Sequence, residues 1–197
     1  MLTIPRPLIL ASKSPRRQKL LTELGFSFTV EENKVDETVP YDMPAKDVPT
    51  YLAEKKAQPF EARSDSNLII AADTIVLLED EILGKPNSRE DALRMLNKLS
   101  GRQHSVITGV TLLMDGQYHT FREVTLVYFK SLSAEDIVYY VDHYQPFDKA
   151  GAYGIQEWIG YIAISRIEGD FYNVMGLPVC RLVQELGQIL DKLEGIK

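Results

Sequence analysis

Apolar residues along the chain alternate between helical spacing and strand-like runs, with turn residues between them. Near the start, Ser14 is a natural N-cap, Pro15 suits the first helical position and Gly25 suits the end of the helix. The pattern predicts strands at residues 8–11, 26–30, 82–86, 104–114 and 121–132, and helices at 15–24, 48–56, 88–101 and 133–144.

The longest apolar run, residues 68–78, is broken only by Asp73 and Thr74, which predicts a central strand buried on both faces. Asp115-Gly116 between two β-branched segments is a strong hairpin signal. Near the C-terminus, strands and a final helix are also expected. Paired strands are predicted at 159–167 and 171–174, and a helix opens at Pro178. The alternation, without a repeat or a low-complexity linker, predicts one mixed α/β domain with a twisted sheet over residues 1–197.

Composition narrows the function classes. The formal net charge is -6, which disfavours a broad, sequence-independent grip on nucleic acid, because that needs a surface dense in Lys and Arg. The chain lacks a basic segment followed by a long apolar stretch at its start, and no run reaches the roughly 18 apolar residues of a membrane span. A soluble, cytoplasmic protein is expected.

Cys180 is the only cysteine, so an intrachain disulfide is impossible and a reducing compartment fits. Because it stands in an apolar helical pattern, we expect it to pack in the core.

The first candidate site lies at the start of the first helix. Arg16 and Arg17 stand in its first turn, where exposed backbone N–H groups already create positive potential. Two cations are favourable there if an anion binds, and the hydroxyls of Ser12 and Ser14 would add donors to phosphate oxygens. A triphosphate is the natural ligand. The alternative is that Ser14 only caps the helix while the arginines face solvent or pair with surface acids.

Asp73 is the most unusual residue for its context. A carboxylate in a strand buried on both faces costs several kcal/mol unless something compensates it. A divalent metal, a basic partner or a location at the end of the strand would do so. Period two places Asp73 on the face of Ala71 and Ile75, and Thr74 on the other.

Further charged residues are candidates for the same chemistry. Glu37, next to Asp36 in a turn-rich acidic segment, could complete an oxygen-rich site, whereas three scattered histidines and one cysteine show no zinc spacing. Mg²⁺ or Mn²⁺ is therefore the expected metal. Lys56 and Lys85 could neutralise phosphates, although a lysine such as Lys56 more often lies on a helix surface and one such as Lys85 more often in a polar loop.

Residues 148–156 form a loop with glycines that allow a backbone to approach a ligand, and Gln156 stands at its end. An amide offers one acceptor and two donors. Gln156 could accept from the ring N–H of uracil or thymine and donate to a neighbouring carbonyl, which would reject cytosine. The alternative is an ordinary loop.

Several short motifs are spread over nearly the whole chain. They are Leu-Ala-Ser-Lys-Ser-Pro-Arg-Arg at residues 10–17, Ala-Asp-Thr at 72–74, Gly-Lys-Pro at 84–86, Leu-Ser-Gly at 99–101, Asp-Lys-Ala-Gly-Ala-Tyr-Gly-Ile-Gln at 148–156 and Gly-Leu-Pro at 176–178. Together, and in this order, they resemble the motifs of the Maf family of nucleotide pyrophosphatases.

This resemblance implies an elongated, two-lobed α/β fold with a central cleft, similar to inosine triphosphate pyrophosphatases. It also implies metal-dependent cleavage between the α and β phosphates of dTTP and UTP, rather than of 7-methyl-GTP, and a homodimer. By resemblance, Asp73 is the proton acceptor, and Arg16, Thr74 and Gln156 are linked to nucleotide choice. The residues around the phosphates are then Ser12, Arg17, Glu37, Lys56 and Lys85. Glu37 and Asp73 are the two acids that we expect to hold the metal.

Two points stay open at this stage. The family shows Glu-Lys where this chain has Lys55-Lys56, and Lys56 is assigned because Leu52-Ala53 and Ala57 bracket it. The second is function itself. A nucleotide-binding regulator of cell division or stress response, without chemistry, is the alternative to the enzyme, and modified pyrimidine triphosphates are a further candidate substrate class.

Overall fold

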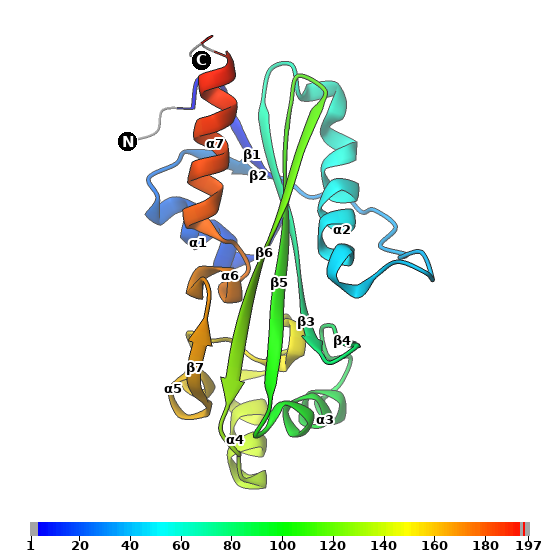
Figure 1. The fold of residues 1–197 in the computed structure, drawn as a ribbon, viewed down its shortest axis with the longest axis vertical. Helices are drawn as coiled ribbons and strands as arrows, with labels where there is room; N and C mark the ends of the chain where they lie inside the picture. Colours follow the sequence, from blue (N-terminus) through cyan, green and yellow to red (C-terminus); the bar gives the residue numbers. More distant parts are fainter. Residues whose placement is uncertain (1–3, 194, 196–197) are drawn as a thin grey trace. The chain divides into compact units, whose positions relative to one another are not determined.

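The structure is a computed structural model that describes residues 4–193 and 195, in which helices flank a seven-stranded mixed sheet (Figure 1). The strand order is β2-β1-β3-β5-β6-β7, with β4 paired to β3. The strands are β1 Leu8–Leu10, β2 Phe28–Val30, β3 Leu68–Leu78, β4 Glu81–Leu83, β5 Gln103–Met114, β6 Gln117–Phe129 and β7 Ile164–Glu168. The helices are α1 Pro15–Glu23, α2 Val48–Ala57, α3 Arg89–Leu99, α4 Ala134–Tyr144, α5 Trp158–Ala163, α6 Phe171–Met175 and α7 Val179–Leu193, with short 3₁₀ turns η1 Ala45–Asp47, η2 Gln58–Arg63 and η3 Ala150–Ala152.

The chain forms two compact units, each described by itself below. The first comprises Met1–Asp73, Thr108–Glu123 and Gly176–Lys197, and the second comprises Thr74–Ile107 and Val124–Met175. The predicted mixed α/β class with a helix-flanked sheet is confirmed. A single domain over 1–197, its elongated two-lobed shape and its cleft stay predictions. Residues 1–3, 194 and 196–197 of that range lie outside the described residues.

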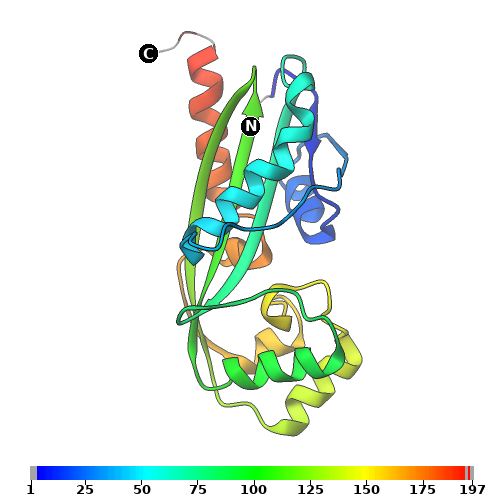
Figure 2. The ribbon, with the colours of Figure 1, turned by 90° about the vertical axis from the view of Figure 1, so that its right-hand side faces the viewer.

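In the first unit, β1 lies between two parallel partners. Leu8 is in register with Phe28 of β2 and with Leu68 of β3. Helix α2 covers one face of these strands, and α1 and α7 lie on the other (Figures 1 and 2). Under α2, buried side chains from three strands, α2 and η2 form one apolar cluster, and each large one that leaves water contributes roughly 1.5–3 kcal/mol. Its members are Ile9, Ala11, Ala57, Phe60, Ile69, Ala71 and Leu113.

Helix α2 can approach the sheet because β5 has a glycine beneath it. A Cβ added at Gly109 would lie 2.3 Å from the carbonyl carbon of Pro49, far closer than any real contact. Pro49 is in the first turn of α2 and is buried. The absence of a side chain at Gly109 therefore allows α2, the helix that carries Lys56, to lie close to β5.

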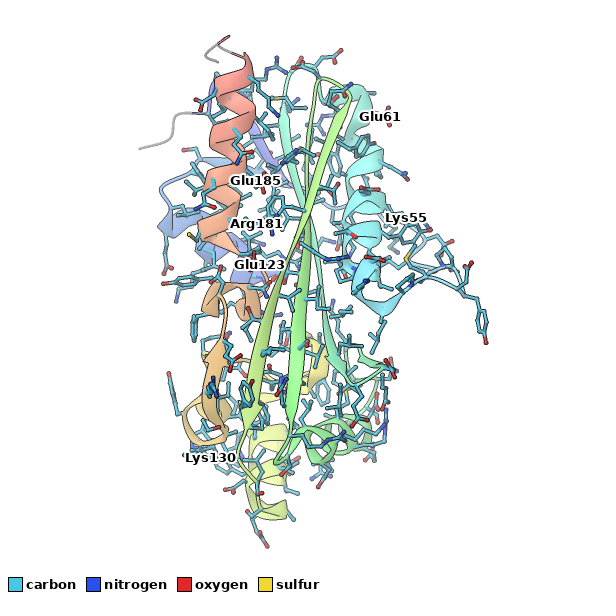
Figure 3. The ribbon with its side chains drawn as sticks, viewed as in Figure 1. Lys55, Glu61, Glu123, Lys130, Arg181 and Glu185 are labelled. Carbon is cyan, nitrogen blue, oxygen red and sulfur yellow. The ribbon has the colours of Figure 1, made fainter. Side chains whose placement is uncertain are left out.

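Helix α7 is attached to β6 by Arg181. Its guanidinium donates to the carbonyl of Arg122 at 2.6 Å and contacts the carboxylates of Glu123 and Glu185 at 3.3 and 3.2 Å (Figure 3). The same guanidinium lies 5.1 Å from the ring centre of Phe121. Among the described residues, no helix is both long and apolar enough to cross a membrane.

Local turn and cap signals in the sequence are mostly confirmed. Asp115 and Gly116 join β5 to β6 with φ of 50° and 68°, the left-handed values that a two-residue hairpin turn requires. Ser133 and Asp136 form a reciprocal capping box at α4 in the second unit. There α3 and α4 pack side by side, and β7 pairs antiparallel with β6.

Two predictions near the C-terminus are wrong. Residues 159–167 and 171–174 do not pair as strands, because most of them form the short helices α5 and α6 and only β7 is extended. Short apolar runs fit a buried helix as well as a strand, and tertiary packing decides between them. Cys180 is exposed rather than buried, because it lies nearly opposite the fully buried Leu182 around helix α7.

Candidate active site

Lys56 is the centre of a charged cluster in the first unit. Its Nζ lies 2.6 Å from Oδ1 of Asp73 and 3.2 Å from Oε1 of Glu37. Lys56 is in the last turn of α2, Asp73 is in the middle of β3, and Glu37 is in the segment between β2 and η1. The side chains of Lys56 and Asp73 are only 20% and 15% exposed. Three residues predicted for one site are therefore in contact.

The two-residue period of β3 explains how Asp73 reaches this cluster. Asp73 shares a face of the strand with Ala71, and Ala71 packs in the same apolar cluster as Ala57 of α2. The carboxylate therefore meets Lys56, the residue before Ala57. Of the three compensating features considered for Asp73, the basic partner is present, whereas the strand continues for five residues beyond it to Leu78.

The neighbouring lysine has a different environment. Nζ of Lys55 donates to the carbonyl of Asp36 at 2.8 Å and lies 5.1 Å from the ring centre of Tyr51 (Figure 3). Lys55 thus holds the acidic segment against α2, while Lys56 contacts the two predicted acids. The geometry agrees with the choice of Lys56 made from the sequence.

Arg17 is buried and bound mainly to backbone. Its Nε donates to the carbonyl of Gly176 at 2.8 Å, and its Nη1 donates to the carbonyl of Ala72 at 2.8 Å and to Oγ of Ser12 at 3.2 Å. Burial lowers the pKa of Arg17 to about 10, opposed by the nearby Asp73 carboxylate, so it stays cationic at neutral pH. Arg17 therefore ties the residue before Asp73 to the loop at Ser12.

Helix α1 begins where the sequence predicts. Ser14 occupies the N-cap position and Pro15 begins the helix, but the Ser14 side chain makes no cap hydrogen bond. Instead the backbone N–H of Ser14 donates to Oγ of Ser12 at 3.2 Å, which folds the loop before the helix. Arg16 is half-buried in the first turn. The first backbone N–H groups of a helix have no partner within it, and such a helix end favours a bound anion.

Gln156, Lys85 and Thr74 belong to the second unit. Oε1 of Gln156 is buried and has no hydrogen-bond partner among the described residues. Lys85 is exposed in the loop after β4, next to Gly84, whose carbonyl accepts from the N–H of Gly151 at 3.0 Å. The loops of Lys85 and Gln156 are thus joined within the unit. Thr74 is half-buried in β3.

Two side chains around Gln156 escaped the sequence analysis. Tyr140 has the spacing of an ordinary buried residue of α4, and Glu157 follows Gln156 without any motif of its own. In the structure they hydrogen-bond to each other. The only signal in the sequence was the position of Glu157, an acid directly after Gln156, and nothing in the sequence pointed to Tyr140.

The donor set fits a divalent metal only in part. Within the described chain, no three His, Cys, Asp or Glu side chains gather as a ready metal cage. Mg²⁺ at nucleotide sites is usually held by one or two carboxylates and completed by phosphates and water. Glu37 and Asp73 contact one shared cation, the ammonium of Lys56, and so offer two hard oxygen donors at one point.

These features define a class: an α/β protein whose first unit combines a helix start that carries two arginines with a cluster of one lysine and two carboxylates, groups that suit a phosphorylated ligand. The family model described as Maf-like protein matches residues 7–189. The chain belongs to the Maf family.

Relatives of similar length carry one name, dTTP/UTP pyrophosphatase. The one from Cytophaga hutchinsonii is 47% identical and aligns over 93% of this chain and 84% of its own length. A relative from Porphyromonas gingivalis is 50% identical and aligns over 91% of this chain and 92% of its own length. One from Bacteroides thetaiotaomicron is 47% identical and aligns over 92% of this chain and 95% of its own length. Among solved structures, the Ham1 protein of Staphylococcus aureus aligns with a TM-score of 0.46 and 15% identity over 63% of this chain and 72% of that one.

Proposed function

We propose that this chain is a nucleoside triphosphate pyrophosphatase that hydrolyses dTTP and UTP to the monophosphate and diphosphate. The observation that carries the proposal is the contact of Lys56 with both Asp73 and Glu37, in a chain whose relatives bear that enzyme's name. The cluster holds a base, cations for phosphate and oxygen donors for a metal, which a regulator without chemistry would not require.

Asp73 is the proposed general base. Its carboxylate takes a proton from a water whose oxygen attacks the α phosphorus, and the bond from that phosphorus to the bridging oxygen of the β phosphate breaks. Lys56 and Arg16 offset the negative charge on the departing diphosphate. Arg17 and Ser12 fix the backbone around Asp73 through the Ala72 carbonyl.

Asp73 and Glu37 would hold Mg²⁺ or Mn²⁺. The metal, when bound, supplies charge neutralisation for the phosphate oxygens. Lys56, whose ammonium contacts both carboxylates, is proposed to bind phosphate oxygens. Lys85, which is exposed in the second unit, is proposed to bind phosphate as well.

Gln156 is proposed to recognise the base. Its buried Oε1 has no partner among the described residues, and a buried acceptor left unsatisfied costs about 1–3 kcal/mol. The ring N–H of uracil or thymine would satisfy it, whereas the corresponding ring nitrogen of cytosine carries no hydrogen. Thr74 and Arg16 are proposed to contribute to nucleotide choice.

We further propose a cytoplasmic homodimer that binds neither nucleic acid nor membrane. The single cysteine supports a reducing compartment, and the net charge of -6 argues against a nucleic-acid surface. Sedimentation equilibrium over a range of protein concentrations tests the dimer directly. A constant monomer mass at all concentrations would exclude it.

The test of the enzyme is diphosphate release from dTTP, UTP, CTP, GTP and 7-methyl-GTP, each with Mg²⁺, Mn²⁺ or a chelator. We expect metal-dependent turnover of dTTP and UTP, lost in Asp73→Asn and kept in Asp80→Asn, which changes an exposed acid on the turn after β3. Nucleotide binding without product in the unaltered protein would favour the regulator. Full turnover by Asp73→Asn would remove Asp73 as the base.

A further inference from the structure

Gln156 occupies a tight turn in the second unit. The N–H of Glu157 donates to the carbonyl of Gly154 at 3.0 Å, which closes the turn around the amide-bearing residue. The N–H of Gly160 in turn donates to the carbonyl of Glu157 at 2.9 Å, so the turn leads directly into α5. The direction of the Gln156 side chain therefore depends on how firmly this turn is held.

The hydroxyl of Tyr140 bridges the two ends of the turn. Its oxygen accepts from the N–H of Gly154 at 3.0 Å and its proton is donated to the Glu157 carboxylate. Tyr140 is fully buried, and burial, together with the Glu157 hydrogen bond, raises its pKa. The phenol therefore stays protonated and keeps its role as donor.

Glu157 is fixed from the other side by Lys149. The Nζ of Lys149 lies 3.1 Å from Oε1 of Glu157 and 2.7 Å from Oδ1 of Asp148. The Lys149 side chain is only 10% exposed, so the ion pair with Glu157 is shielded from water. Both carboxylate oxygens of Glu157 thus have a partner, one from Tyr140 and one from Lys149.

Two glycines let these groups approach so closely. A Cβ on Gly154 would lie 2.9 Å from the carboxyl carbon of Glu157, and one on Gly160 would lie 1.8 Å from the carbonyl oxygen of Ile155. A side chain at either glycine would therefore collide with one of the two residues that flank Gln156.

We propose that Tyr140 and Glu157 are positioning residues that support the base selectivity of Gln156 by fixing the turn that carries it. The inference rests on the proposed function of Gln156. With the turn fixed, Oε1 accepts from the ring N–H of uracil or thymine, whereas the corresponding ring nitrogen of cytosine carries no hydrogen. Loosening the turn should therefore weaken uridine binding and leave cytidine binding nearly unchanged.

That loss of uridine affinity alone separates the proposal from simple damage to the fold, which would weaken the binding of both nucleotides. The measurement is calorimetric affinity for the nonhydrolysable α,β-imido analogues of UTP and CTP, with Mg²⁺, in the unaltered protein and in Tyr140→Phe and Glu157→Gln. Tyr128→Phe is the matched control. It removes a hydroxyl that donates to Glu168 at 3.0 Å elsewhere in the same unit.

We expect the ratio of uridine to cytidine affinity to fall about tenfold in Tyr140→Phe, the value of one well-made hydrogen bond, and to fall also in Glu157→Gln. The control should keep the ratio of the unaltered protein. Glu157→Gln carries the test alone if Tyr140→Phe does not fold.

The proposal is overturned if both variants keep the ratio, if they weaken both analogues equally, or if the unaltered protein does not discriminate between them. Because the binding measurement involves no turnover, its outcome is independent of the diphosphate-release assay. If the unaltered protein does not hydrolyse UTP but the ratio of uridine to cytidine affinity still falls in the variants, the proposed function is rejected. Tyr140 and Glu157 would then remain residues that support base selectivity.

Discussion

The ammonium of Lys56 lies 2.6 Å from the Asp73 carboxylate and 3.2 Å from that of Glu37. The lysine therefore supplies a counter-charge to both acids. Competition between the lysine and a divalent ion for the same two carboxylates follows from Coulomb's law, because both are positive.

Replacing Lys56 with glutamine should strengthen metal binding and weaken catalysis. Without the ammonium, the two acids lose their counter-charge, and we expect Mn²⁺ affinity in the absence of nucleotide to rise about tenfold. Diphosphate release should fall about a hundredfold, because a cation for the leaving group is gone. Electron paramagnetic resonance of free Mn²⁺ gives the first quantity. Lys19→Gln, at an exposed pair with Glu23 on α1, is the control and should change neither quantity. Unchanged Mn²⁺ affinity in Lys56→Gln would disprove the metal site.

Arg17→Lys should destabilise the protein despite keeping the charge. A lysine cannot reproduce the fork that binds the carbonyls of Ala72 and Gly176 and the Ser12 hydroxyl, and we expect the free energy of unfolding to fall by about 2 kcal/mol. Urea denaturation measures it. Arg63→Lys, at an exposed pair with Glu31, should leave the midpoint unchanged, and an equal effect of both substitutions would contradict the structural role of Arg17.

Gly109→Ala and Gly187→Ala should have opposite effects on stability. The methyl group at Gly109 would collide with the backbone of Pro49 and displace α2, at a cost of about 1–3 kcal/mol. At Gly187, inside α7, nothing lies within 4 Å of the added Cβ, so alanine should stabilise the helix by about 1 kcal/mol. Thermal unfolding of both variants checks the pair. If both substitutions change the unfolding temperature by the same amount and in the same direction, α2 is not packed against Gly109.

His104 should make stability depend on pH. It is buried in the second unit, its Nε2 lies 2.7 Å from the Tyr153 hydroxyl, and Nδ1 has no partner among the described residues. Burial lowers the pKa of His104 to about 4, from about 6.5 in an unfolded chain. The unfolded chain therefore binds this proton first as pH falls, and stability should drop by about 1.4 kcal/mol per pH unit between about 6.5 and 4, then level off.

The measurement for His104 is urea unfolding at several pH values between 7 and 4. In His104→Gln the stability should be less sensitive to acid, so the gap between unaltered protein and variant narrows as pH falls. His143→Gln, at an exposed position on α4, is the control and should follow the unaltered protein. Parallel curves for the unaltered protein and His104→Gln would exclude the buried neutral histidine.

Local signals in the sequence predicted most of the elements. The Asp115-Gly116 hairpin and the Ser133 cap of α4 depend on nearby residues alone, and β3 occupies the predicted residues 68–78. The prediction of paired strands at 159–167 and 171–174 is wrong, because these short runs carry no period long enough to separate helix from strand.

By itself, the sequence determined the class of fold, the family and the set of charged residues to consider, since these depend on local propensity and on motifs contiguous in the chain. Only the tertiary structure decided that Lys56, rather than Lys55, meets Asp73, that Arg17 binds backbone, and that Tyr140 holds the turn of Gln156. Such pairings join residues far apart in the chain. They depend on how closely packed elements approach one another, as α2 does at Gly109, and no local pattern encodes that distance.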